Sequence, residues 1–174
     1  MSSTVDIADS AGTQTVTEQD DLLATLAQHR HFLRYTTRDL TDGQAAERTT
    51  VSALCLGGLI KHVTAVEQSW VAFVLGDQKE ASPEQWAGQF EVLPGETLAG
   101  LLAAYDQTAE RTTAVFSALP ELSESRPLPE APWFEPGARW SYRRVLLHLI
   151  AETSQHAGHA DIIREALDGS RTMG

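Results

Sequence analysis

Residues 140–169 read WSYRRVLLHLIAETSQHAGHADIIREALDG, and this stretch carries the pattern that decides the fold. Successive side chains on an α-helix turn by about 100°, so Glu152, His156 and His159 project from one face within about two turns. Apolar residues fall within about 60° of the same line, namely Val145, Leu149, Ile163 and Leu167. Three ionisable side chains therefore interrupt a seam that faces the protein interior, where unpartnered polar groups are costly.

Three further segments show helical periodicity, and none shows sustained strand alternation. They run over about 18–40, 52–75 and 96–119, and the quoted stretch adds a fourth helix over about 140–167. Two long connections remain, a polar one with Pro83, Trp86 and Phe90 and a proline-rich one over 127–137. The sequence therefore predicts an all-α four-helix bundle in one domain, residues 18–174, after a disordered or loosely ordered tail, residues 1–17.

Composition narrows the classes of partner. The chain has 174 residues and a net charge of −11, which argues against nucleic-acid partners and anionic membrane surfaces. It contains no apolar run long enough to span a membrane, and its first residues lack the basic start and apolar stretch of a secretory signal. The single cysteine, Cys55, excludes an intramolecular disulfide and reads as a buried structural thiol. These features predict a cytoplasmic protein with a small-molecule partner.

A divalent metal ion is the partner that the interrupted seam predicts, because histidine and glutamate are usual metal ligands. His62 lies on the apolar side of the second helix and adds a ligand from another element. The candidate ligands are His62, His156, Glu152 and His159. The i, i+4 spacing favours Glu152 and His156 as a pair of ligands, whereas the i, i+3 spacing also admits His159. A candidate that does not bind the metal itself would orient one of the ligands by a hydrogen bond. The alternative is a plain bundle with hydrogen-bonded core histidines.

The remaining histidines have simpler interpretations. His148 lies one turn before Glu152 and reads as a hydrogen-bonded core histidine. On the first helix, His29 falls on the apolar seam and His31 on the surface. None of these three histidines is therefore expected to bind the metal.

Two segments resemble one known family, the DinB-like superfamily, and in particular its actinobacterial branch. They are residues 140–169 and residues 58–70, GLIKHVTAVEQSW. The resemblance covers roughly residues 20 to 170 and implies an up-down-down-up bundle that holds a divalent metal, often zinc or nickel, near one end. The superfamily typically uses three histidines, of which His62 matches the first and His156 the last. Glu152 departs from this pattern, so either Glu152 or His159 can supply the third ligand.

The resemblance also implies an activity, because some relatives are thiol transferases or isomerases that use mycothiol or bacillithiol. It implies a detoxifying S-transferase with zinc or nickel and with mycothiol as a co-substrate. Iron or manganese is the alternative, because mixed histidine and carboxylate sites accept several first-row metals. His159, if it is not a ligand, can act as the catalytic general base. Residues that can line the substrate mouth are Trp133, Phe134, Tyr142 and Arg143. Two alternatives stay open: a metal-dependent hydrolase, and a non-catalytic, stress-associated metal-binding protein or homodimeric interaction module.

Overall fold

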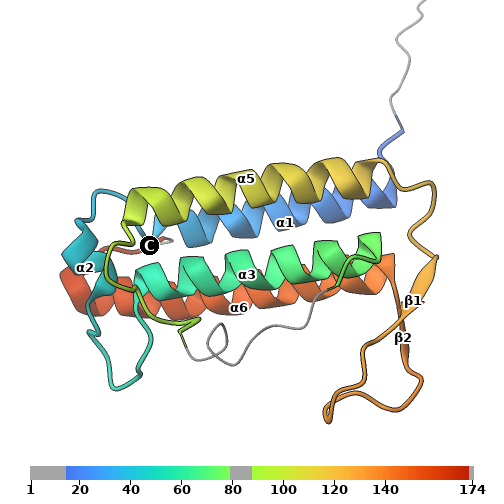
Figure 1. Ribbon diagram of the computed structural model, residues 1–174. Helices are drawn as coiled ribbons and strands as arrows, with labels where there is room; N and C mark the ends of the chain where they lie inside the picture. The colour runs from blue at the N-terminus through green and yellow to red at the C-terminus, as the bar shows by residue number, and fades with distance from the viewer. Residues whose placement is uncertain (1–14, 79–87, 173–174) are drawn as a thin grey trace, which may run out of the picture.

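Four long helices build the protein in a computed structural model that describes residues 15–78 and 88–172. They are α1 (Glu18–Tyr35), α3 (Leu56–Leu75), α5 (Leu98–Ser117) and α6 (Tyr142–Asp168). Helices α1 and α3 each pack against both α5 and α6, so α1 lies diagonally opposite α3. Figure 1 shows that α1 and α6 run in one direction and α3 and α5 in the other. The predicted all-α bundle with up-down-down-up topology is confirmed.

Two predictions fall outside the described residues. The tail predicted over residues 1–17 is described only from Thr15 onward, and Pro83 and Trp86 of the polar connection are not described. The single-domain boundary at residue 18 stays a prediction. Apart from the end of the first helix, the helix ends predicted from the sequence lie within a few residues of the observed ones.

The first helix ends earlier than predicted, at Tyr35 rather than Leu40. The Thr36 hydroxyl donates a hydrogen bond of 2.7 Å to the carbonyl of Leu33, and Asp39 adopts a positive φ of 58°. A short helix, α2 (Asp42–Ala46), follows, and its capping box pairs Thr41 with Gln44. A new helix therefore begins just beyond residue 40, where the sequence predicted the end of the first helix.

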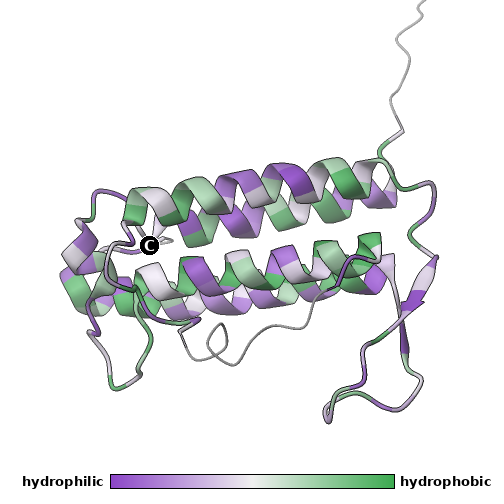
Figure 2. Cartoon of the chain, viewed as in Figure 1, coloured by the Kyte–Doolittle hydropathy of each residue, from purple (hydrophilic) through white to green (hydrophobic). Residues whose placement is uncertain are grey.

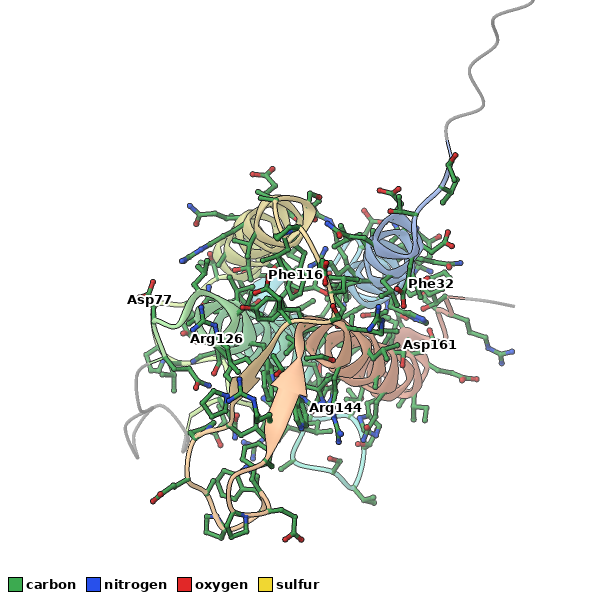
Figure 3. All side chains as sticks on the ribbon, turned by 90° about the vertical axis from the view of Figure 1, so that its right-hand side faces the viewer. Phe32, Asp77, Phe116, Arg126, Arg144 and Asp161 are labelled. Carbon is green, nitrogen blue, oxygen red and sulfur yellow. The ribbon has the colours of Figure 1, made fainter. Side chains whose placement is uncertain are left out.

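A two-stranded hairpin, not predicted from the sequence, joins α5 to α6. Strand β1 (Ser125–Pro127) pairs antiparallel with β2 (Arg139–Ser141). Arg126 ties the hairpin to the body by donating a 2.8 Å hydrogen bond to the Val74 carbonyl, and Figure 3 shows Arg126 at this end of the bundle. Trp133, in the loop between the two strands, is 71% exposed.

The core consists of two apolar clusters with polar groups between them. Figure 2 shows hydrophilic and hydrophobic residues alternating along the four long helices. The cluster nearer the hairpin contains Leu26, Phe116 and Leu146, and the one nearer α2 contains Leu33, Leu59 and Ala160. Among the buried polar residues are Arg30, His62, Glu67 and His156. Within the described ranges, no helix is long and apolar enough to cross a membrane.

Candidate metal centre

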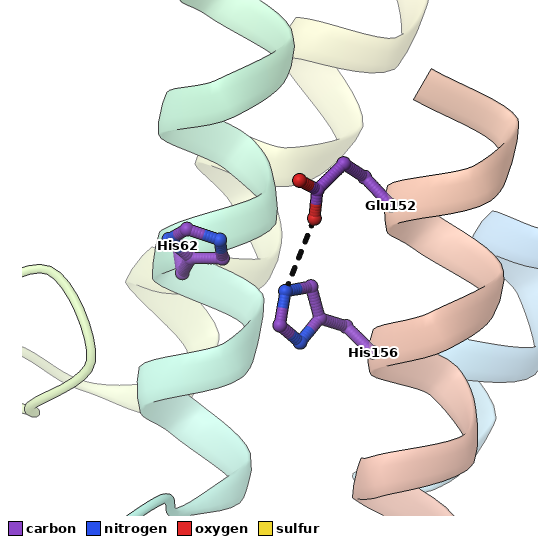
Figure 4. Close-up of side chains that lie close together, drawn as sticks. All are labelled: His62, Glu152 and His156. Atoms are coloured by element: carbon purple, nitrogen blue, oxygen red, sulfur yellow. Dashed lines mark ion pairs between the residues drawn. The ribbon is translucent and has the colours of Figure 1, made fainter. Parts of the chain in front are cut away.

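Three of the four predicted ligands meet between α3 and α6. His62, Glu152 and His156 each offer one nitrogen or oxygen atom, and these atoms all lie within 4.8 Å of one another. The Nε2 atom of His156 lies 3.2 Å from Oε2 of Glu152, and the rings of His62 and His156 meet edge to face with centroids 4.8 Å apart. Figure 4 shows all three side chains converging from the two helices. Two imidazoles and a carboxylate form a donor set that suits a divalent first-row metal.

The position of this cluster follows from the core. On α6, Leu149 of one apolar cluster precedes the site, and Ala157 of the other follows it. The site therefore lies between the two apolar clusters. The resemblance implied a position near one end of the bundle, and the structure places it closer to the middle of α6.

Burial and mutual contact set the charge of these groups. His62 and His156 are each only 8% exposed, whereas 28% of the Glu152 side chain is exposed. Burial, aided by the nearby His156, lowers the pKa of His62, although the Gln89 hydrogen bond opposes this. The hydrogen bond with His156 lowers the pKa of Glu152. Near neutral pH, the site thus offers a neutral His62 imidazole and an ionised Glu152 carboxylate, the forms that bind metals.

A strap formed by residues 88–92 holds the His62 ring. Oε1 of Gln89 lies 3.0 Å from Nδ1 of His62, and the Phe90 ring stacks on the imidazole with centroids 4.1 Å apart. When Nδ1–H donates to Gln89, the lone pair of Nε2 stays free for a metal. Gln89 thus fixes the tautomer and the orientation of the first predicted ligand.

The strap can lie this close because the first turn of α3 has no side chains in its way. A Cβ on Gly58 would come within 1.9 Å of the Phe90 carbonyl oxygen, and one on Gly57 within 2.6 Å of the Val92 side chain. Lys61 adds a 3.2 Å hydrogen bond to the Glu91 carbonyl, and Cys55 is buried beneath the strap, as predicted. Sequence reasoning missed Gln89, but adjacent glycines in a helix are a signal of close backbone approach.

His159 lies outside the three-residue cluster and contacts it from behind. Its Nδ1 is 3.3 Å from Nδ1 of His156, the ring nitrogen that faces away from Glu152. This geometry suits a hydrogen bond that orients His156. Such a role is the one expected from the sequence for a candidate residue that does not bind the metal itself. His159 as a ligand or as a general base stays a prediction.

His148 approaches Glu152 from the other side, with Nε2 3.9 Å from Oε1. Its ring lies edge-on to two stacked indoles, those of Trp70 and Trp140, at centroid distances of 5.0 and 5.2 Å. Burial lowers the pKa of His148, although Glu152 opposes this effect. His148 is therefore half-buried beside the site rather than a fully enclosed core histidine.

Several other polar and aromatic residues lie away from the site. Glu67, one face away on α3, forms a buried ion pair with Arg30 of α1. Tyr142 is 5% exposed in the apolar core, so it cannot line a substrate mouth. His29 is half-buried and His31 exposed on α1, in agreement with their predicted positions.

Replacing Gln89 with leucine should weaken metal binding by about 10- to 100-fold, because outer partners that orient a ligand typically contribute that much. The side chain keeps its bulk but loses the acceptor for His62 Nδ1–H. Competition with a chromophoric chelator measures the affinity. Gln89→Glu, which keeps an acceptor, is the control and should bind at least as tightly as the wild type. Equal affinity of the leucine variant and the wild type would contradict this role.

The four-helix bundle and the His/Glu/His cluster between two of its helices place the protein in the class of DinB-like bundles with a candidate metal site. The family model described as "Mycothiol-S-transferase" matches residues 21–169, and the chain belongs to this family. The recognised resemblance is thereby confirmed. A solved structure, described as a conserved protein from Enterococcus faecalis, is similar with a TM-score of 0.65 and 15% identity, covering 90% of this chain and 100% of that one. This similarity supports the fold alone. No curated protein matches the sequence.

Proposed function

We propose that the protein is a metal-dependent mycothiol S-transferase whose metal is held by His62, Glu152 and His156. The observation that carries the proposal is the convergence of these three donor atoms within 4.8 Å in a chain of the mycothiol S-transferase family. Three protein ligands leave a coordination position open, which is typical of catalytic rather than structural metal sites. Zinc and nickel suit the two imidazoles and the carboxylate, and iron and manganese are also compatible with them.

A divalent ion bound here would lower the pKa of a thiol at its open position and so favour the thiolate at neutral pH. The side chains around the ion would orient the ligands, offset part of the metal charge and exclude water. Gln89 and His159 hold the His62 and His156 rings in place, and the Glu152 carboxylate offsets part of the metal charge. Phe90 covers the His62 ring and excludes water from that side. His159 is also the nearest histidine outside the ligand set, and we retain it as the predicted acceptor of the thiol proton.

The reaction is a substitution at an electrophilic carbon. The mycothiol S–H bond breaks and its proton leaves to a base, the sulfur forms a bond to the carbon, and the leaving group departs with its electron pair. Monobromobimane is a suitable electrophile, because displacement of bromide gives a fluorescent conjugate. We expect metal-loaded protein to accelerate this reaction with mycothiol, and metal-free protein to lose the acceleration.

Two variants test the ligand assignment in the same assay. Glu152→Ala removes a proposed ligand and should lower metal affinity and turnover more than His159→Ala, which removes an orienting contact. Metal content and rate are measured on the same samples. The opposite order would exclude Glu152 as a ligand in favour of His159. Stoichiometric metal without any metal-dependent conjugation would instead support the hydrolase or the non-catalytic alternative.

A further inference from the structure

One side of the candidate centre is more exposed than the other. On the far side, the Gln89–Phe90 strap covers His62, and His156 is equally buried. On the near side, both Glu152 and His148 keep more than a quarter of their side chains exposed, at 28% and 29%. Among the described residues, the side of the cluster that carries Glu152 and His148 is therefore the one more accessible to a small molecule.

Beyond His148, at the start of α6, lies a hollow that is shallow and open to solvent. Its volume is about 500 Å³, and its lining residues are Trp140, Ser141, Arg143, Arg144, Leu147 and His148. His148 adjoins both the hollow and the candidate centre, because it lines the hollow and its Nε2 lies 3.9 Å from Oε1 of Glu152. The hollow and the cluster are thus neighbouring parts of one surface along α6.

Arg144 supplies an available positive charge in this hollow. Its guanidinium lies over the Trp140 ring, with Cζ 4.6 Å from the ring centroid. Within the described ranges its guanidinium has no hydrogen-bonded or ion-paired partner, whereas the adjacent Arg143 forms an ion pair with Glu18. Among the residues that the structure describes, other arginines of the chain, such as Arg38 and Arg126, also have no carboxylate partner, and Arg144 differs from them in lining this hollow. Figure 3 shows Arg144 beside the hairpin.

Stacking on Trp140 leaves the edge of the guanidinium available. A planar guanidinium held against an indole loses little freedom when it binds a carboxylate or phosphate with its N–H groups. Trp140 is itself fixed, because its other face stacks on Trp70 with an interplanar angle of 4°. The cation is therefore held in place before any ligand arrives.

We propose that this hollow is the subsite for an anionic group on the electrophilic substrate, and that Arg144 binds the group while the electrophilic carbon lies at the centre. The inference rests on the proposed S-transferase function. Arg144 and Glu152 are eight residues apart on one helix, about 12 Å along its axis. The substrate class is thus an elongated electrophile with a carboxylate or phosphate remote from its reactive carbon, with His148 and Trp140 beside its apolar middle.

The test compares a charged and an uncharged electrophile of the same shape. The probes are 4′-(chloromethyl)biphenyl-4-carboxylate and its methyl ester, each reacting with mycothiol by displacement of chloride. Arg144→Gln should lower kcat/KM for the carboxylate about tenfold, mainly through KM, and leave the ester within about twofold, because one charge-assisted hydrogen bond is lost. Arg144→Lys should restore part of the preference. Equal losses for both probes, or no loss for either, would overturn the proposal.

A binding measurement separates this inference from the proposed function. Calorimetric titration of the metal-loaded protein uses the unreactive 4′-methylbiphenyl-4-carboxylate and its carboxamide. The carboxylate should bind about tenfold more weakly to Arg144→Gln, and the carboxamide equally well to both proteins. Arg111→Gln is the matched control, since Arg111 is an exposed arginine of α5, which lies diagonally opposite α6. Arginine-dependent binding without conjugation would contradict only the transferase function. Binding that ignores Arg144, or that Arg111→Gln weakens equally, would contradict the subsite.

Discussion

Replacing His156 with alanine is expected to reduce bound metal from about one ion per chain to nearly none. His156 lies next to both of the other donors, 3.2 Å from Glu152 and with its ring against that of His62. Its removal leaves only two ligands, on separate helices. We expect an affinity loss of at least about 1,000-fold, which corresponds to about 4 kcal/mol. Elemental analysis of protein purified without a metal-affinity tag measures the content, and chelator competition measures the affinity.

The matched variants are His62→Ala and His31→Ala. His62→Ala should lose metal as severely as His156→Ala, because it removes the only ligand from α3. His31→Ala removes an exposed histidine of α1 and should keep the full metal content. Negligible metal in the wild type, or unchanged metal in both ligand variants, would leave the plain bundle with hydrogen-bonded histidines as the better account.

The second large effect concerns stability and is independent of the metal. Glu67→Ala should lower the free energy of unfolding by about 3–5 kcal/mol, since it leaves Arg30 buried without its counter-charge. Both Arg30 Nε and Nη2 donate to the Glu67 carboxylate, and Glu67 is 1% exposed. The loss is large against a typical total of about 5–15 kcal/mol. Urea unfolding followed by circular dichroism measures it.

The control removes both charges together. In Arg30→Met/Glu67→Met, no buried charge lacks a partner, and apolar side chains of similar length fill the space. This double variant should therefore be much more stable than Glu67→Ala, and a substitution of this kind is often close to neutral. A Glu67→Ala loss below about 1 kcal/mol would show that water or another group compensates Arg30.

The bundle itself could be predicted from the sequence because long amphipathic helices repeat their pattern over several turns. The quoted stretch predicted α6 within two residues at its start and one at its end. The short elements could not be predicted in the same way. Strands of three residues, such as β1 and β2, show too little alternation to detect, and the Thr41–Gln44 capping box resembles a helix stop as much as a start.

The site was predictable only where helical spacing determines it. The i, i+4 relation placed Glu152 beside His156, and the apolar side of α3 placed His62 opposite them. Gln89 lies in a connection without periodicity, so its contact with His62 depends on a tertiary approach that spacing does not describe. Helical spacing also explains why Glu67 is not part of the site. Glu67 follows His62 by five residues, so its side chain points away from the centre and toward Arg30.

Anomalous diffraction from crystals of the metal-loaded protein tests most directly whether a metal ion lies between α3 and α6. We predict one strong anomalous peak per chain, about 2.0–2.2 Å from a nitrogen of His62, a nitrogen of His156 and an oxygen of Glu152. His159 should then be hydrogen-bonded to His156 and not in contact with the ion. An ion bound elsewhere, or no peak in metal-saturated crystals with these three side chains hydrogen-bonded to one another, would contradict the account.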